Sequence, residues 1–274
     1  LGDVYKRQGL YYEQPIYIAT QENWDLELDP QIRTNRGFGL YSTLRFLDSP
    51  YSTGELNFGA FRENSSYFHD ENLKNQTHYG IELKYSRDDL IKSLLSDNFQ
   101  EGLWIDATYL NDVDYLNLGS RDYRDLNSLV TSKINYFLAD ENNFYGAYAR
   151  YYIDTSKLSN NTTLQEYPSF QYHRFLNNLF DERLRYSFDA SFHNFYRPAG
   201  SYANELNLDL PISYHNAFFG DFLHFTFTER FYASFVNYSN DPERNHEHYF
   251  RNTHDFNLYT DLSKAYENFF HTLN

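Results

Sequence analysis

Residues 10–64 read LYYEQPIYIATQENWDLELDPQIRTNRGFGLYSTLRFLDSPYSTGELNFGAFREN, and the rest of the chain repeats their pattern. Hydrophobic and polar residues alternate, as in a β-strand with one apolar side and one hydrated side. Turn-forming residues divide the stretch into segments close to the ~9–11 residues that a tilted membrane-spanning strand needs. These segments are 10–19, 24–32, 37–47 and 55–63.

The same alternation predicts nine further strands, about one per 20 residues, with alternating short turns and longer loops, as in a membrane barrel. Their ranges are 77–86, 104–110, 127–138, 144–153, 165–175, 183–193, 202–212, 222–237 and 253–262. Strands of a soluble sandwich usually recur every ~8–12 residues. We therefore expect residues 9–274 to form an all-β fold, an antiparallel transmembrane β-barrel fragment with about 13 strands of a larger barrel. Alone, such a fragment would form an open curved sheet or close falsely.

Composition agrees with a barrel wall. Aromatic residues make up 20% of the chain, yet the mean hydropathy is -0.73. No stretch approaches the ~18 consecutive apolar residues of a transmembrane helix. Alternate apolar residues and interfacial girdles of Tyr and Phe give this combination in membrane barrels. A tyrosine-rich soluble all-β protein remains the alternative.

The formal net charge of -15 argues against binding to nucleic acid, which requires basic patches. The chain has no cysteine, which excludes a disulfide framework and a thiol nucleophile in this sequence. It also has no methionine, so we expect it to be an internal or trimmed piece of a longer product. Residues 1–8, LGDVYKRQ, resemble a translated sequencing-adaptor tail and are excluded from the fold.

We expect no enzyme activity, no catalytic residue, no cofactor and no metal site. The chain lacks a nucleophile-elbow motif, a P-loop and a dinucleotide-binding fingerprint. His246, Glu247 and His248 have metal-ligand side chains, but we expect them in a loop without a third convergent ligand.

Charged residues on the polar side of the predicted strands should face the barrel lumen, since an unpaired charge is costly inside a packed core. The expected lumen-facing residues are Arg45, Glu82, Lys84, Arg183, Arg185, Asp189, His193, Glu205 and Asp209.

Pro15 and Pro30 lie inside the first two predicted strands. Proline lacks the N–H that a strand ladder requires, so both residues would weaken the seam where the first and last strands of a barrel meet. They are candidates for a lateral gate. The alternative is that Pro15 marks a strand start and Pro30 a strand end.

The order of these features resembles the start of the barrel of the LptD (OstA) family, the lipopolysaccharide-assembly translocon of the Gram-negative outer membrane, in an epsilonproteobacterial-like form. The matching positions are Tyr11, Tyr12, Pro15, Asn23, Asp25, Pro30, Arg36, Gly37 and Arg45. Residues 112–118, DVDYLNL, are similar to a further family element, although Asn117 replaces an acidic residue. Residues 164–175 and 259–266 also look like family segments.

The resemblance implies the N-terminal half of a barrel of about 26 strands that inserts lipopolysaccharide into the outer leaflet of the outer membrane. Lipid A would leave through a lateral gate weakened by Pro15 and Pro30, while the saccharide crosses the lumen. The implied partners are lipopolysaccharide, outer-membrane lipid, the lipoprotein plug LptE and periplasmic Lpt bridge proteins. A general diffusion porin or solute channel, and a soluble β-rich binding module, remain the alternatives.

Overall fold

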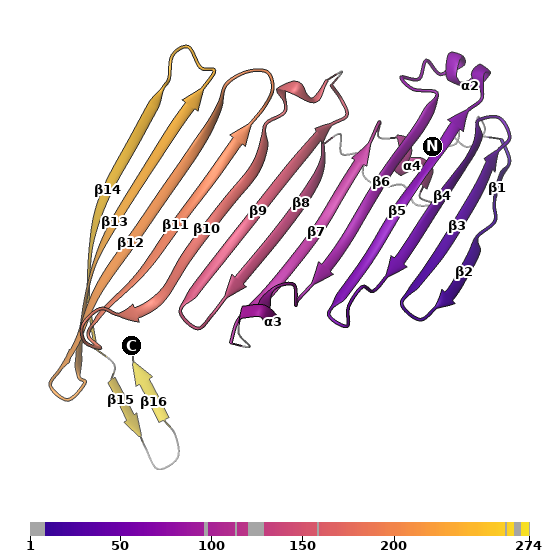
Figure 1. Cartoon of the computed structure of the whole chain (residues 1–274). Coiled ribbons are helices and arrows are strands. Elements are labelled where there is room, and N and C mark those ends of the chain that lie inside the picture. The colour runs from indigo at the N-terminus through magenta and orange to yellow at the C-terminus, as the bar shows by residue number, and fades with distance from the viewer. Residues whose placement is uncertain are drawn as a thin grey trace.

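The computed structural model describes residues 9–95, 98–112, 114–119, 129–157, 159–260, 262–265 and 270–273. The expected adaptor tail at residues 1–8 lies outside this part. The described chain is all-β and forms one open, antiparallel sheet of 14 strands, as the sequence predicts (Figure 1). Each strand pairs with the next one along the chain from β3 to β14.

The strand bounds follow the alternating pattern. The first half of the sheet contains β1 (Tyr11–Glu13), β2 (Ile16–Gln21), β3 (Trp24–Arg33), β4 (Gly37–Phe46), β5 (Ser52–Glu63), β6 (Thr77–Arg87) and β7 (Gln100–Leu110). The second half contains β8 (Leu129–Ala139), β9 (Asn143–Asp154), β10 (Gln165–Asn178), β11 (Leu184–Tyr196), β12 (Tyr202–Phe218), β13 (Leu223–Ser239) and β14 (His246–Tyr259). All thirteen predicted segments are present, because β1 and β2 together form the first.

Several strands are longer than predicted; β7, for example, begins at Gln100 rather than at residue 104. Strand β14 begins at His246 rather than at residue 253, so His246, Glu247 and His248 lie in a strand and not in a loop. Residues 246–252 contain few apolar side chains, so the two-residue alternation of a strand is hard to recognise there. After β14, β15 (Leu262–Ala265) pairs with β16 (Phe270–Leu273) in a separate hairpin.

Cross-strand registers give the sheet two unlike faces. One face carries exposed aromatic and aliphatic side chains in every part of the sheet, including Phe38 on β4, Ile81 on β6, Phe170 on β10 and Phe231 on β13. We call it the apolar face. The opposite face carries most of the charged side chains of the strands, and we call it the polar face.

Short helices occupy three connections: α2 (Ser65–Asp70), α3 (Lys92–Leu95) and α4 (Asp114–Gly119). Helix α4 lies against the polar face beside β5 and β6 (Figure 1). It completes the buried hydrophobic cluster of the described residues, which consists of Tyr41, Phe61, Leu110, Tyr115 and Leu118.

Within the described residues, no helix has both the length and the apolar character needed to cross a membrane.

Candidate functional site

The edge strand is interrupted at Pro15. Strand β1 ends at Glu13 and β2 begins at Ile16, and both pair with β3 in one register from Tyr11 to Ile18, which then shifts before Gln21. That register places Gln14 opposite Pro30 and Pro15 opposite Asp29. Pro30 itself lies inside the ten-residue strand β3, so it does not mark a strand end.

Each proline removes one backbone donor at this edge: Pro30 on β3 lacks the N–H that would face the edge strand, and Pro15 lacks the N–H that would face away from β3. Gln14 donates its backbone N–H to the carbonyl oxygen of Pro30 at 3.2 Å, and Pro30 has no N–H with which to return the bond. Neighbouring strand residues direct their N–H groups to opposite edges of the strand. The missing N–H of Pro15 would therefore face away from β3, toward the edge that no other strand of the described residues covers.

The registers place eight of the nine expected lumen-facing residues on the polar face: Arg45, Glu82, Lys84, Arg185, Asp189, His193, Glu205 and Asp209. Arg183 lies in the turn before β11, where its carbonyl oxygen accepts the N–H of His215 and extends the ladder. The sequence thus identified residues that share one side of the sheet, although they belong to strands far apart in it.

A row of charged residues crosses the polar face from β3 to β10. Its members lie directly opposite one another on successive strands: Asp25, Arg45, Glu55, Lys84, Asp106, Lys133, Arg150 and Glu166. The signs alternate except at Lys133 and Arg150. Arg45 lies 2.7 Å from Asp25, and Arg150 lies 3.1 Å from Glu166. Opposite charges in direct register stabilise the pairing of neighbouring strands.

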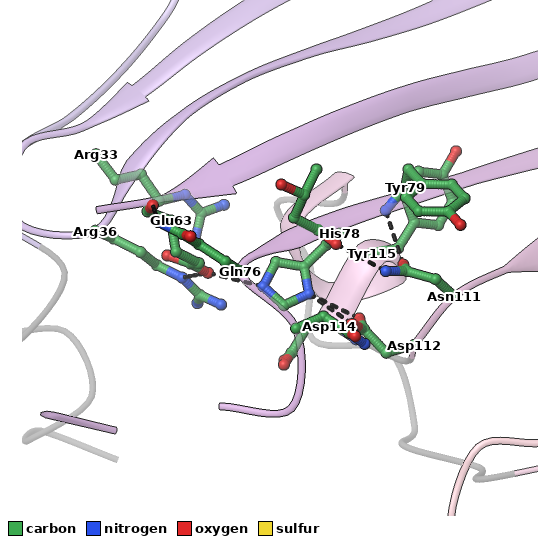
Figure 2. Close-up of polar contacts among 12 residues, drawn as sticks. Arg33, Arg36, Glu63, Gln76, His78, Tyr79, Asn111, Asp112, Asp114 and Tyr115 are labelled. Atoms are coloured by element: carbon green, nitrogen blue, oxygen red, sulfur yellow. Dashed lines mark hydrogen bonds and ion pairs between the residues drawn. The ribbon is translucent and has the colours of Figure 1, made fainter. Parts of the chain in front are cut away.

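A buried polar network lies at one end of the polar face (Figure 2). The Nδ1 atom of His78 lies 2.8 Å from Asp112, and its Nε2 atom lies 3.1 Å from Glu63. The Glu63 carboxylate also accepts a hydrogen bond from Arg36 at 2.7 Å. The side chains of His78 and Glu63 are buried. The network joins the β3–β4 turn, β5, β6 and the connection after β7.

Asp112 anchors the segment that leads into α4. Burial acts to raise the pKa of this carboxyl group, but hydrogen bonds from His78 and Asn75 outweigh it and hold the pKa below its usual range. The Asp112 carboxylate also accepts the backbone N–H of Asp114 at 3.1 Å, which fixes the start of the helix.

Helix α4 is held against the strands that contain the proline interruption. Gln31 and Arg33, both on β3, donate hydrogen bonds to the carbonyl oxygen of Leu118 at 3.0 and 3.2 Å. On β6, a Cβ atom at Gly80 would lie 2.6 Å from the ring of Tyr115, so glycine provides the space in which α4 packs. The helix therefore connects the buried network to β3, one residue from Pro30.

Two groups of residues have the side chains of a metal site. Ligand atoms of His78, Asp112 and Asp114 lie within 4.8 Å of one another. However, both ring nitrogens of His78 already face carboxylates, so the geometry is that of an ion-pair network. In β14, strand alternation directs Glu247 to the face opposite His246 and His248, so these three residues do not converge.

Sequence reasoning did not identify the network or the docking of α4. Arg36 and Asp112 were parts of family-like motifs, whereas Glu63 and His78 were included only as residues of predicted strands. A signal was present, because His78 and Glu63 both fall on the polar side of their strands. Which of the many polar residues would meet depends on the path of the connection after β7, which alternation does not determine.

Comparison with known proteins gives no family. No family model matches the chain, and no curated protein matches it. Among solved structures, the chain is similar to the crystal structure of Acinetobacter baumannii OccAB4, with 11% identity and a TM-score of 0.32. The match covers 91% of this chain and 66% of the OccAB4 chain. A similarity this low supports no inference about function.

Proposed function

We propose that this chain is part of an outer-membrane β-barrel that inserts lipopolysaccharide into the outer leaflet of Gram-negative cells. The observation that carries the proposal is the pair of prolines at the edge of the described sheet: Pro15 interrupts the edge strand, and Pro30 on β3 withholds a ladder donor from it. The resemblance to the LptD family implies that this edge is the lateral gate. The role is transport, with no catalytic step.

The exposed apolar face supports insertion in a membrane, because soluble proteins rarely leave a large contiguous apolar surface uncovered. On β12, the apolar face carries Leu206, Leu208, Leu210 and Ile212, with Tyr214 beyond one end and Asn204 and Tyr202 beyond the other. Twelve residue steps separate the two tyrosines, which gives about 40 Å of strand, or about 30 Å of membrane at a tilt near 40°. This matches a hydrocarbon core between two aromatic girdles.

The proposed path uses both faces. The saccharide would follow the hydrated polar face, where charged and amide side chains replace water as hydrogen-bond partners. Lipid A would leave at the edge strand. An unsatisfied backbone group there costs several kcal/mol in lipid, which makes this seam easier to open than a fully paired one. Lipopolysaccharide, outer-membrane lipid, the lipoprotein plug LptE and the periplasmic Lpt bridge proteins are the proposed partners.

A second candidate is a general diffusion porin or solute channel. The observation that favours it is the charged row from Asp25 to Glu166, because rings of charged side chains select ions in channels. Ion conductance by the complete protein in planar bilayers, without transfer of lipopolysaccharide, would favour this candidate.

Site-specific photocrosslinking in cells tests the proposal. A photoreactive residue in place of Tyr17, which is exposed on the edge strand β2, should capture lipopolysaccharide. The same residue in place of Tyr51, which is equally exposed but lies in a turn, should not. Absence of a crosslink at position 17, or equal crosslinks at both positions, would contradict the proposal.

A further inference from the structure

Aromatic side chains gather on the polar face at β7, β8 and β9, beside the charged row. The ring centroids of Trp104 and Phe137 lie 5.4 Å apart with their planes at 13°, and those of Phe137 and Phe144 lie 5.9 Å apart at 10°. We call these three residues the aromatic row. An aromatic girdle cannot explain it, because girdle residues face lipid and these face the hydrated side.

The sheet leaves room for these rings. A Cβ atom at Gly102 would lie 2.4 Å from the Phe137 ring and 2.7 Å from the Trp104 ring, so both rings lean over a glycine. On β9, the ring of Tyr148 covers Gly146 in the same way. Trp104 nevertheless keeps 45% of its surface exposed. A large ring that is exposed on a charged face is available to stack on a ligand.

Trp104 lines a cavity of about 890 Å³ on this part of the sheet. The charged row passes through the same cavity, which is also lined by Arg45, Lys84, Asp106, Lys133 and Asn135. The volume lies within the ~300–1,000 Å³ that is usual for small-ligand sites. Donors and acceptors alternate along the wall, so the cavity suits a ligand with many hydroxyl groups better than a polyanion.

We propose that Trp104 and the adjoining charged row form a saccharide-binding subsite. A pyranose ring would place its apolar C–H face on Trp104. Its hydroxyl groups would donate to Asp106 and accept from Lys84 and Lys133, each of which lies directly opposite Asp106 on a neighbouring strand. The inference deepens the proposed function and rests on it in one respect: the polar face must line the saccharide path.

The test is calorimetric titration of the complete protein in detergent, with the oligosaccharide released from lipopolysaccharide by mild acid as the probe. Trp104→Ala should weaken binding about tenfold, which corresponds to the loss of one stacking contact, and Trp104→Phe should keep most of the affinity. Tyr109→Ala is the matched control. Tyr109 is an exposed aromatic residue of the same strand, but it lies on the apolar face.

Wild-type affinity in Trp104→Ala, or an equal loss in Tyr109→Ala, would overturn the subsite. If Trp104→Ala does not fold, Asp106→Asn and Lys133→Gln take its place, with the same expectation of weaker binding. The assay involves no transfer of lipid. If these variants weaken binding while changes at Pro15 and Pro30 leave lipopolysaccharide transfer unchanged, the proposed function fails and the subsite stands.

Discussion

Gln14 and Pro30 lie opposite each other across the first strand pair and share one backbone hydrogen bond, from Gln14 N to Pro30 O at 3.2 Å. An ordinary pair at this position would share two. One backbone bond contributes about 0.5–1.5 kcal/mol in water, and more in lipid. The edge strand therefore lacks one ladder bond where it meets the second proline.

Replacing Pro30 should strengthen this pair. In Pro30→Ala, residue 30 regains an N–H that can bond to Gln14, so amide hydrogen exchange across residues 10–20 should become slower. Exchange measured by mass spectrometry on the protein in detergent checks this. Pro50→Ala, in the turn before β5, is the control and should leave exchange in this segment unchanged. Equal exchange in wild type and Pro30→Ala would show that the missing donor does not weaken the edge.

The buried network predicts a large penalty for the loss of His78. His78→Ala leaves the buried carboxylates of Glu63 and Asp112 without their common partner, and breaking a buried charged contact costs roughly 3–5 kcal/mol. Urea unfolding in lipid vesicles measures the free energy. His248→Ala, an exposed histidine on β14, should change it by less than about 0.5 kcal/mol.

A double-mutant cycle separates the contact from the packing. His78→Ala and Asp112→Asn together should cost less than the sum of the two single changes, with a coupling of roughly 0.5–3 kcal/mol. Strict additivity would mean that the two residues do not interact in solution.

Asp112 also predicts sensitivity to acid. Its folded pKa is lowered, so the unfolded chain takes up a proton at Asp112 at a higher pH than the folded protein does. The stabilisation is therefore complete above the ordinary value of 3.8 and is lost as the pH falls through the lowered folded value. The difference in unfolding free energy between wild type and Asp112→Asn should be present at pH 5 and shrink below about pH 4. A difference that disappears between pH 7 and pH 5 would contradict this account.

Gly80 should tolerate no larger side chain. Valine at this position would place atoms within 3 Å of the Tyr115 ring and displace α4 from the polar face. We expect Gly80→Val to destabilise the protein by about 1–3 kcal/mol and to make the segment around residues 111–119 sensitive to added protease. Gly59→Ala on β5 is not a suitable control, because Tyr41 packs closely there. Ala107→Val, on the apolar face of β7, is suitable.

Alternation predicted the all-β fold and the common face of Arg45, Lys84, Asp189 and Glu205, because strand geometry directs every second side chain to the same side. It also placed Pro15 in the first strand and Pro30 in the second, which correspond to the edge strand and to β3. It did not predict that His78 would meet Asp112, since that contact depends on how a connection folds back over the sheet. Strand β14 was predicted too short because the stretch from His246 to Asn252 has little apolar contrast.

Transfer of lipopolysaccharide tests the central claim most directly. The complete protein, reconstituted in liposomes with its periplasmic bridge, would be compared with a variant that carries both Pro15→Ala and Pro30→Ala. If the prolines weaken a lateral opening, the variant should fold normally, conduct ions as the wild type does, and transfer lipopolysaccharide several-fold more slowly. Pro50→Ala should transfer at the wild-type rate. Unchanged transfer in the double variant would contradict the gate.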